Sequence, residues 1–199
     1  MSLSRIRFLL WAVAGLAAAA MIILIWRQAE PRSGVEQTTM STVGGPFTLT
    51  GTDGKPFASS RLNGKPAAVF FGFTNCPDVC PTTLARLARL RQQLGQGDDA
   101  LSIVFISVDP ERDTPSELAN YMKLYDTPVV GLTGTPAQIE QVKQQFGIYS
   151  RKVQQPGGGY SVDHTAAVLL MDRNGQFVAT LSPDEGDAVA LDKLRRISA

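Results

Sequence analysis

Three residues of this chain have chemical types that suit a soft metal ion or redox chemistry. Cys76 and Cys80 are the only cysteines among the 199 residues and form a Cys-x-x-x-Cys motif, and His164 is the only histidine. Two thiolates and an imidazole make a three-coordinate site that suits Cu(I), and Cu(II) if another ligand joins. The residue types also leave other interpretations open. A lone histidine is often an ordinary surface or core residue, and the cysteine pair could be a structural disulfide in an exported protein.

The two cysteines lie where a predicted strand turns into a predicted helix. The apolar run Ala67–Phe73 is typical of a buried strand. The segment Pro81–Leu94 carries Leu84, Leu87 and Leu94 on one side at helical spacing. Unpaired N–H groups and the positive end of the helix dipole favour a thiolate at the start of a helix. We therefore expect this position to support chemistry at sulfur rather than packing alone.

The rest of the chain predicts strands and helices in an order that defines a fold class. The expected elements are a short hairpin at 46–57, strands at 101–108 and 129–132, helices at 115–125 and 135–146, a flexible loop at 154–160, a hairpin at 166–181 and a helix at 187–197. This order matches a thioredoxin-like α/β fold. In that fold, the loop that carries His164 lies beside the loop that carries the two cysteines.

The segment Asp109–Pro115 contains three carboxylates and an arginine, and two interpretations compete for it. It could form an acidic metal site or an acid–base site. Alternatively, it is a loop that leads into a helix, because Thr114, Pro115 and Glu117 fit the first positions of a capping box. We favour the helix cap, and Thr135-Pro-Ala-Gln138 fits the start of the next helix in the same way.

The N-terminal part predicts a membrane anchor. The charge-free segment Phe8–Trp26 would span roughly 28 Å as a helix, which is close to the thickness of a bilayer core. A cleaved signal peptide could end at Ala17–Ala20, but the apolar residues continue past this point and favour an uncleaved anchor. The expected organisation is a cytoplasmic tail at 1–7, a transmembrane helix at 8–26, a linker at 27–45 and a domain at 46–199. The protein would then cross the inner (cytoplasmic) membrane once, with its domain facing the periplasm.

The charge balance bears on the class of partner. The chain has 19 lysines and arginines against 18 aspartates and glutamates. Nucleic-acid-binding proteins normally show a basic excess or a basic stripe, and neither is present in the sequence. We expect no nucleic acid partner.

Four motifs together resemble the Sco/SenC family, over about residues 45–199. They are Phe71-Gly-Phe-Thr-Asn-Cys76-Pro-Asp-Val-Cys80-Pro81, Val108-Asp-Pro-Glu-Arg-Asp-Thr-Pro115, Gly131-Leu-Thr-Gly-Thr135 and Tyr160-Ser-Val-Asp-His164-Thr165. Members of this family are membrane-anchored copper proteins that help to assemble the dinuclear copper centre of cytochrome c oxidase. The resemblance implies that Cys76, Cys80 and His164 bind copper as Cu(I) and Cu(II).

The chain departs from the family pattern at two places. Asn75 replaces the histidine that many members have before the first cysteine, although that position is not a family ligand. The loop at Gly157–Gly159 is also short, which affects the surface available for partner contacts.

Three classes of function are consistent with the motifs. The first is a metallochaperone, rather than an enzyme, that delivers copper to the copper-bearing subunit of cytochrome c oxidase. The second is a thiol–disulfide oxidoreductase that keeps target cysteines reduced, and the two roles can coexist. Other copper chaperones or thiol–disulfide proteins are then further partners. The third is a peroxiredoxin-like peroxidase, for which Thr74 is present but the motif places no arginine. We rank them in that order.

Overall fold

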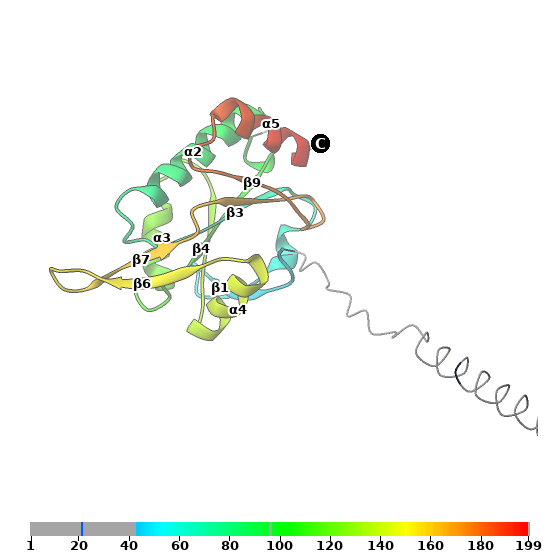
Figure 1. Cartoon of the computed structure of the whole chain (residues 1–199). Coiled ribbons are helices and arrows are strands. Elements are labelled where there is room, and N and C mark those ends of the chain that lie inside the picture. The colour runs from blue at the N-terminus through cyan, green and yellow to red at the C-terminus, as the bar shows by residue number, and fades with distance from the viewer. Residues whose placement is uncertain (1–20, 22–42, 96, 199) are drawn as a thin grey trace, which may run out of the picture. The chain divides into compact units, whose positions relative to one another are not determined.

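The computed structural model describes Met21, residues 43–95 and residues 97–198 (Figure 1). The chain divides into two compact units, Met1–Met40 and Ser41–Ala199, and the second contains the predicted domain. The predicted membrane segment 8–26 lies, apart from Met21, outside the described residues. Among the residues that are described, no helix has the length and apolar character needed to cross a membrane.

A mixed sheet forms the centre of the second unit. Within the described residues its seven strands follow the order β2-β1-β5-β4-β3-β8-β9. Their bounds are β1 Thr48–Gly51, β2 Pro56–Ala58, β3 Ala67–Gly72, β4 Ser102–Ser107, β5 Val129–Thr133, β8 Val168–Met171 and β9 Phe177–Leu181. Strands β3, β4 and β5 are parallel, and the other pairs are antiparallel. This arrangement confirms the predicted thioredoxin-like α/β fold.

Strand β3 is buried along its whole length because helices cover both faces of the sheet. Its alternating side chains point to opposite faces. The Phe71 ring lies 5.5 Å from that of Phe146, which belongs to α4 (Pro136–Phe146). The Phe70 ring instead lies 6.1 Å from that of Phe105. Helices α2 (Val79–Leu94) and α5 (Asp187–Ser198) pack side by side over the sheet (Figure 1).

The buried face of α2 is wider than the predicted stripe. Leu84 and Leu87 are buried as expected, but Leu90 is also buried, whereas Leu94 is only half-buried. Helix α5 also packs against α2. The helix ends at Gly95, whose φ of +76° lies in the left-handed region that glycine adopts readily.

The two predicted helix caps are confirmed. Helix α3 (Pro115–Met122) begins after Thr114, whose hydroxyl accepts a hydrogen bond from the Glu117 N–H. Helix α4 begins with a complete capping box between Thr135 and Gln138. Helix α3 ends three residues before the predicted position near Tyr125, and the chain continues there as a turn. The described residues also form two short 3₁₀ helices, η1 (Ser59–Leu62) and η2 (Gly97–Asp99).

One hairpin was not predicted from the sequence. Strands β6 (Ser150–Gln154) and β7 (Tyr160–His164) pair with each other as a separate two-stranded sheet. The segment expected to be a flexible loop is the turn of this hairpin, since Gln154 pairs with Tyr160 at its closed end. His164 is therefore the last residue of a strand.

Candidate metal centre

The sheet topology brings the predicted ligands together at one edge. The segment 73–80, named here the cysteine loop, follows the carboxyl end of β3. Strand β8 runs antiparallel to β3, so that Leu169 pairs with Val69. The chain entering β8 therefore passes close to the cysteine loop, and this segment begins at His164. The ligand atoms of Cys76, Cys80 and His164 all lie within 4.8 Å of one another. The Sγ atom of Cys80 lies 3.6 Å from Nε2 of His164, across 84 residues of sequence.

The two cysteines are free thiols in different environments. Cys76 is half-buried in the loop, and Cys80 is fully buried in the first turn of α2. The backbone N–H of Cys80 donates to Cys76 Sγ over 3.4 Å, which is the favourable interaction expected at a helix start. A ligand pair with one accessible and one enclosed sulfur follows from this arrangement.

The expectation that the helix start favours a thiolate is wrong for Cys80. Burial raises the pKa of the Cys80 thiol far above its ordinary value, because the anion would lose its hydration in this position. A bound cation would reverse this preference, since thiols that coordinate a metal release their protons. Binding of a metal ion at this site would therefore release a proton from the thiol.

His164 presents a nitrogen lone pair to the cysteines. Its Nδ1 lies 2.9 Å from the Thr165 carbonyl oxygen, which only accepts, so Nδ1 carries the proton and Nε2 is free to coordinate. Burial lowers the pKa of His164, so the neutral ring is favoured. The rings of Phe70 and Phe73 contact the imidazole edge-on, with centroids 6.0 Å and 5.8 Å away. The imidazole is thus held in an orientation suited to a metal.

Gly72 provides the space for Cys80. A Cβ atom at this position would lie 2.8 Å from Cys80 Sγ and 2.7 Å from Cε2 of Phe105. Both distances are shorter than van der Waals contact, so a larger residue would displace the sulfur or the ring. The glycine before the cysteine loop is therefore a requirement of the site.

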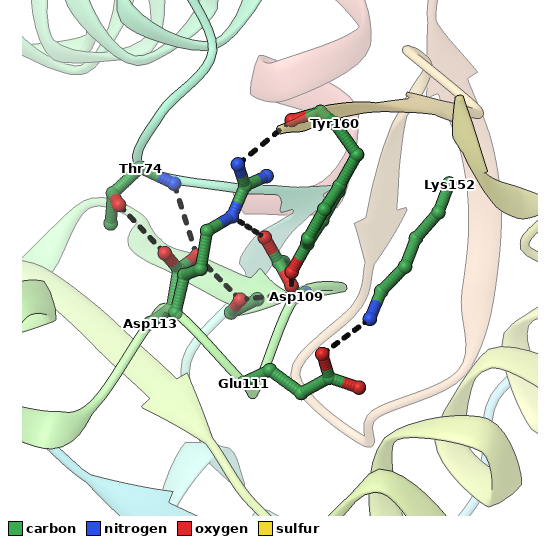
Figure 2. A network of polar contacts seen from close by, with 8 residues as sticks. Thr74, Asp109, Glu111, Asp113, Lys152 and Tyr160 are labelled. Carbon is green, nitrogen blue, oxygen red and sulfur yellow. Dashed lines mark hydrogen bonds and ion pairs between the residues drawn. The ribbon is translucent and has the colours of Figure 1, made fainter. Parts of the chain in front are cut away.

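The acidic segment after β4 supports the site without joining it. Among the described residues, the group of possible metal ligands contains only the two cysteines and the histidine. The carboxylates of Asp109 and Asp113 are fully buried and accept hydrogen bonds from neighbouring loops (Figure 2). Burial raises the pKa of Asp113, although hydrogen bonds from Ser107 and Thr74 act in the opposite direction. The structure thus favours the loop and helix cap over an acidic metal site.

Several supporting residues were missed in the sequence. Asp113 accepts hydrogen bonds from both the N–H (3.0 Å) and the hydroxyl (2.6 Å) of Thr74, two residues before Cys76. Tyr160 and Arg112 connect the other ligand segment to Asp109. The signal available in the sequence was the pair of aspartates in a short loop, but their partners are 39 and 51 residues away.

The same contacts argue against the peroxidase arrangement. The Thr74 hydroxyl donates to Asp113 rather than pointing freely toward Cys76. The Arg112 guanidinium donates to the Asp109 carboxylate and the Tyr160 carbonyl. Both groups that a peroxidase would direct at its reactive sulfur are therefore engaged in holding loops.

Comparison with known proteins finds a family model that matches most of this chain. The SCO1/SenC family model matches residues 35–199. The mitochondrial SCO1 homolog 1 of Arabidopsis thaliana is 39% identical over 140 residues, which are 69% of this chain and 42% of that protein. The chain therefore spans less than half the length of this relative.

Solved structures share the fold. The structure of ScoI from Bradyrhizobium japonicum with copper bound is 42% identical, with a TM-score of 0.71, and the match covers 78% of this chain and 99% of that chain. A more distant structure, BsSco, described as a member of the Sco family of cytochrome c oxidase assembly proteins, is 24% identical with a TM-score of 0.62. That match covers 80% of this chain and 95% of the other, and it supports the fold alone.

We predict that Gly72→Ala disrupts the centre. The new methyl group would overlap Cys80 Sγ and Phe105, so we expect the free energy of unfolding to fall by about 1–3 kcal/mol, as is typical of overpacking. Urea denaturation of the reduced protein measures this change. Gly157→Ala is the matched control, because a Cβ atom there has no neighbour within 4 Å. Equal stability of the two variants would contradict the close approach.

Proposed function

The chain belongs to the SCO1/SenC family, and we propose that it binds copper through Cys76, Cys80 and His164 and delivers it during assembly of cytochrome c oxidase. The observation that carries the proposal is the convergence of two sulfur atoms and an imidazole nitrogen within 4.8 Å. A related structure with the same fold, ScoI of Bradyrhizobium japonicum, is described with copper bound.

The donor set suits copper in both oxidation states. Two thiolates satisfy the soft Cu(I) ion, and the imidazole adds a third ligand in a trigonal arrangement. Cu(II) prefers nitrogen and oxygen donors more than Cu(I) does, so His164 contributes more to binding of the oxidised ion. One site can therefore hold copper before and after a change of oxidation state.

The partial exposure of the site is consistent with transfer of its cargo. Cys76 and His164 are half-buried, and the loop residues Asn75, Pro77 and Asp78 between and beside the cysteines are exposed. A ligand from a partner could approach copper from this side and displace one protein ligand at a time. We propose the copper-bearing subunit of the oxidase as that partner, as membership of the SCO1/SenC family suggests.

A thiol–disulfide oxidoreductase is the second candidate. The Sγ atoms of Cys76 and Cys80 lie within 4.8 Å of each other, and both cysteines are free thiols, so an intramolecular disulfide could form if the two sulfur atoms move closer together. An accessible Cys76 and a buried Cys80 also suit exchange with a partner. This role alone gives no reason for an imidazole directed at the sulfur atoms.

We also propose the location of the protein. The apolar segment 8–26 would anchor it in the inner membrane, and its domain would face the periplasm, where an exported copper protein meets its partner. The basis of this proposal is the sequence of that segment.

Copper binding should depend on the redox state of the cysteines. A Cys76–Cys80 disulfide removes both sulfur donors, so we expect oxidised protein to bind essentially no copper and reduced protein to bind one ion per chain. Titration of the full chain before and after reduction, with the disulfide confirmed by mass, measures this. Cys76→Ser and Cys80→Ser should each abolish tight binding. Equal copper uptake in both redox states would place the metal elsewhere and favour the oxidoreductase.

His164→Ala should separate the two oxidation states. We expect a larger loss of affinity for Cu(II) than for Cu(I), because two thiolates still satisfy the softer ion. Disulfide exchange should persist in this variant. Competition titrations with chelators specific for each ion measure the affinities, and Gln155→Ala at the exposed tip of the same hairpin is the control. If His164→Ala binds both ions as the wild type does, the three-ligand site is wrong.

The proposed anchor predicts the cellular fraction of the protein. We expect the full chain in the membrane fraction after alkaline washing, with its domain sensitive to protease added from the periplasmic side. N-terminal sequencing of the purified protein provides an independent check. A soluble periplasmic protein that begins just after Ala20 would show that the segment is a cleaved signal peptide.

A further inference from the structure

We propose that the segment Asp109–Asp113, named here the clamp loop, holds the two ligand-bearing segments in a fixed position relative to each other. It ties the cysteine loop to the β6–β7 hairpin and thereby sets the position of His164 relative to Cys76 and Cys80. The proposal rests on the proposed copper site and adds positioning residues to it. Figure 2 shows the network that carries it.

One arm of the clamp loop reaches the cysteine loop. The Asp113 carboxylate accepts hydrogen bonds from the Thr74 N–H and hydroxyl, and from the Ser107 hydroxyl over 2.6 Å. A fully buried carboxylate needs such partners to offset its lost hydration. Because Thr74 lies two residues before Cys76, these bonds fix the backbone that leads into the first sulfur ligand.

The other arm reaches the hairpin. The Tyr160 hydroxyl donates to Asp109 over 2.8 Å, and the Arg112 guanidinium donates to both the Asp109 carboxylate and the Tyr160 carbonyl. The Arg112 guanidinium carbon also lies 3.9 Å from the centre of the Tyr160 ring. Tyr160 is the first residue of β7, and His164 is its last. The hairpin is thus held at the end opposite to its metal ligand.

The two arms are joined within the clamp loop and through Ser107, the last residue of β4. The Asp109 N–H donates to the Ser107 hydroxyl, which in turn donates to Asp113. The Asp113 N–H donates to the Asp109 carbonyl over 3.0 Å. Displacement of one carboxylate would therefore disturb the contacts of the other. The clamp loop acts as one unit rather than as two separate loop contacts.

The hairpin needs this support because it does not pair with the main sheet. Within the described residues, β6 and β7 form hydrogen-bonded strands only with each other. An isolated two-stranded hairpin is marginally stable in water. Of its strand residues only Val162 is buried, so apolar packing contributes little. The polar contacts at Tyr160 and the ion pair between Lys152 and Glu111 therefore help to fix the hairpin in place.

The side-chain alternation of β7 transmits this position to the metal ligand. Tyr160, Val162 and His164 share one face of the strand, since side chains two apart point the same way. The clamp loop holds the first, the core holds the second, and the third faces Cys80. Loosening Tyr160 should rotate or shift the strand and move Nε2 of His164 away from the sulfur atoms.

Loss of the hairpin arm and loss of the cysteine arm should differ in their effects on the binding of Cu(I) and the binding of Cu(II). The hairpin arm acts on His164 alone, whose contribution is larger for Cu(II). The cysteine arm acts on the sulfur ligands, which both ions need. A change that merely destabilised the fold would lower the affinity for both ions to the same extent and would lower the melting temperature of the protein.

Tyr160→Phe tests the hairpin arm in the full chain. It removes the hydroxyl bonded to Asp109 and leaves the ring on Arg112. We expect about tenfold weaker Cu(II) binding, in the range found when outer partners of metal ligands are lost, a shifted thiolate-to-Cu(II) absorption band, and unchanged Cu(I) binding. Tyr149→Phe is the matched control, because Tyr149 is exposed and its hydroxyl lies outside the network. Behaviour of Tyr160→Phe like that of Tyr149→Phe would overturn the proposal, as would an equal loss for both ions.

Thr74→Val tests the cysteine arm. It removes the hydroxyl bonded to Asp113 but keeps the N–H bond, so the fold should be retained. We expect weaker binding of both Cu(I) and Cu(II), in contrast to Tyr160→Phe. Thr180→Val on the exposed side of β9 is the control. If Thr74→Val binds both ions as this control does, the clamp loop does not position the cysteines.

A measurement without copper separates this proposal from the proposed function. In the reduced, metal-free full chain, nuclear Overhauser contacts between the His164 ring and the Cys80 side chain report their distance. We expect these contacts in the wild type and in Tyr149→Phe, and their loss in Tyr160→Phe. Their retention in Tyr160→Phe would overturn the clamp even if wild-type copper binding is confirmed. Absence of copper binding by the wild type would reject the proposed function while leaving this test valid.

Discussion

The parallel pairing of β3 with β4 is the constraint on which the site depends. Phe71 pairs with Ile106 and Gly72 with Ser107 at the ends of these strands. Because the strands run in the same direction, the cysteine loop and the clamp loop leave the sheet at the same edge. The antiparallel pairing of β8 with β3 then returns the chain from His164 to this edge. Ligands separated by 84 residues meet because three adjacent strands fix where their connecting segments begin and end.

The two buried carboxyl groups explain why the loops around the site adopt one arrangement. A carboxylate removed from water is costly unless hydrogen bonds replace its hydration, and an unsatisfied buried acceptor costs about 1–3 kcal/mol. Asp109 and Asp113 are both fully buried. Their donors come from the cysteine loop, the strand end and the hairpin, so these segments must adopt one arrangement for the carboxylates to be satisfied. The cysteines and the histidine are therefore surrounded by hydrogen bonds and ion pairs of Asp109 and Asp113, and these two aspartates are not among the possible metal ligands.

Local features of this fold could be predicted from the sequence, whereas contacts between distant segments could not. The strand before Cys76, the helix after Cys80 and the caps at Thr114 and Thr135 depend on short-range periodicity and hydrogen bonding. The β6–β7 hairpin was missed because most of its side chains face water and give no clear apolar alternation. Burial of Cys80 was also missed, since it depends on the space left by Gly72 and not on the helix start. The convergence of His164 with the cysteines followed from the fold class, but the network that positions it did not.

The difference between the two sulfur atoms shapes what the site can exchange with a partner. Burial raises the pKa of Cys80, so this thiol keeps its proton until a cation replaces it. Cys76 is more accessible and is the sulfur that a partner can reach first. The same geometry would suit both proposed roles, because a partner would reach bound copper or a disulfide from the side of Cys76. His164 distinguishes them: a neutral imidazole with its lone pair directed at Cys80 stabilises a metal ion but is not required for a thiol pair. The residue that selects between the two chemistries is therefore the one supplied by the hairpin, not by the cysteine motif.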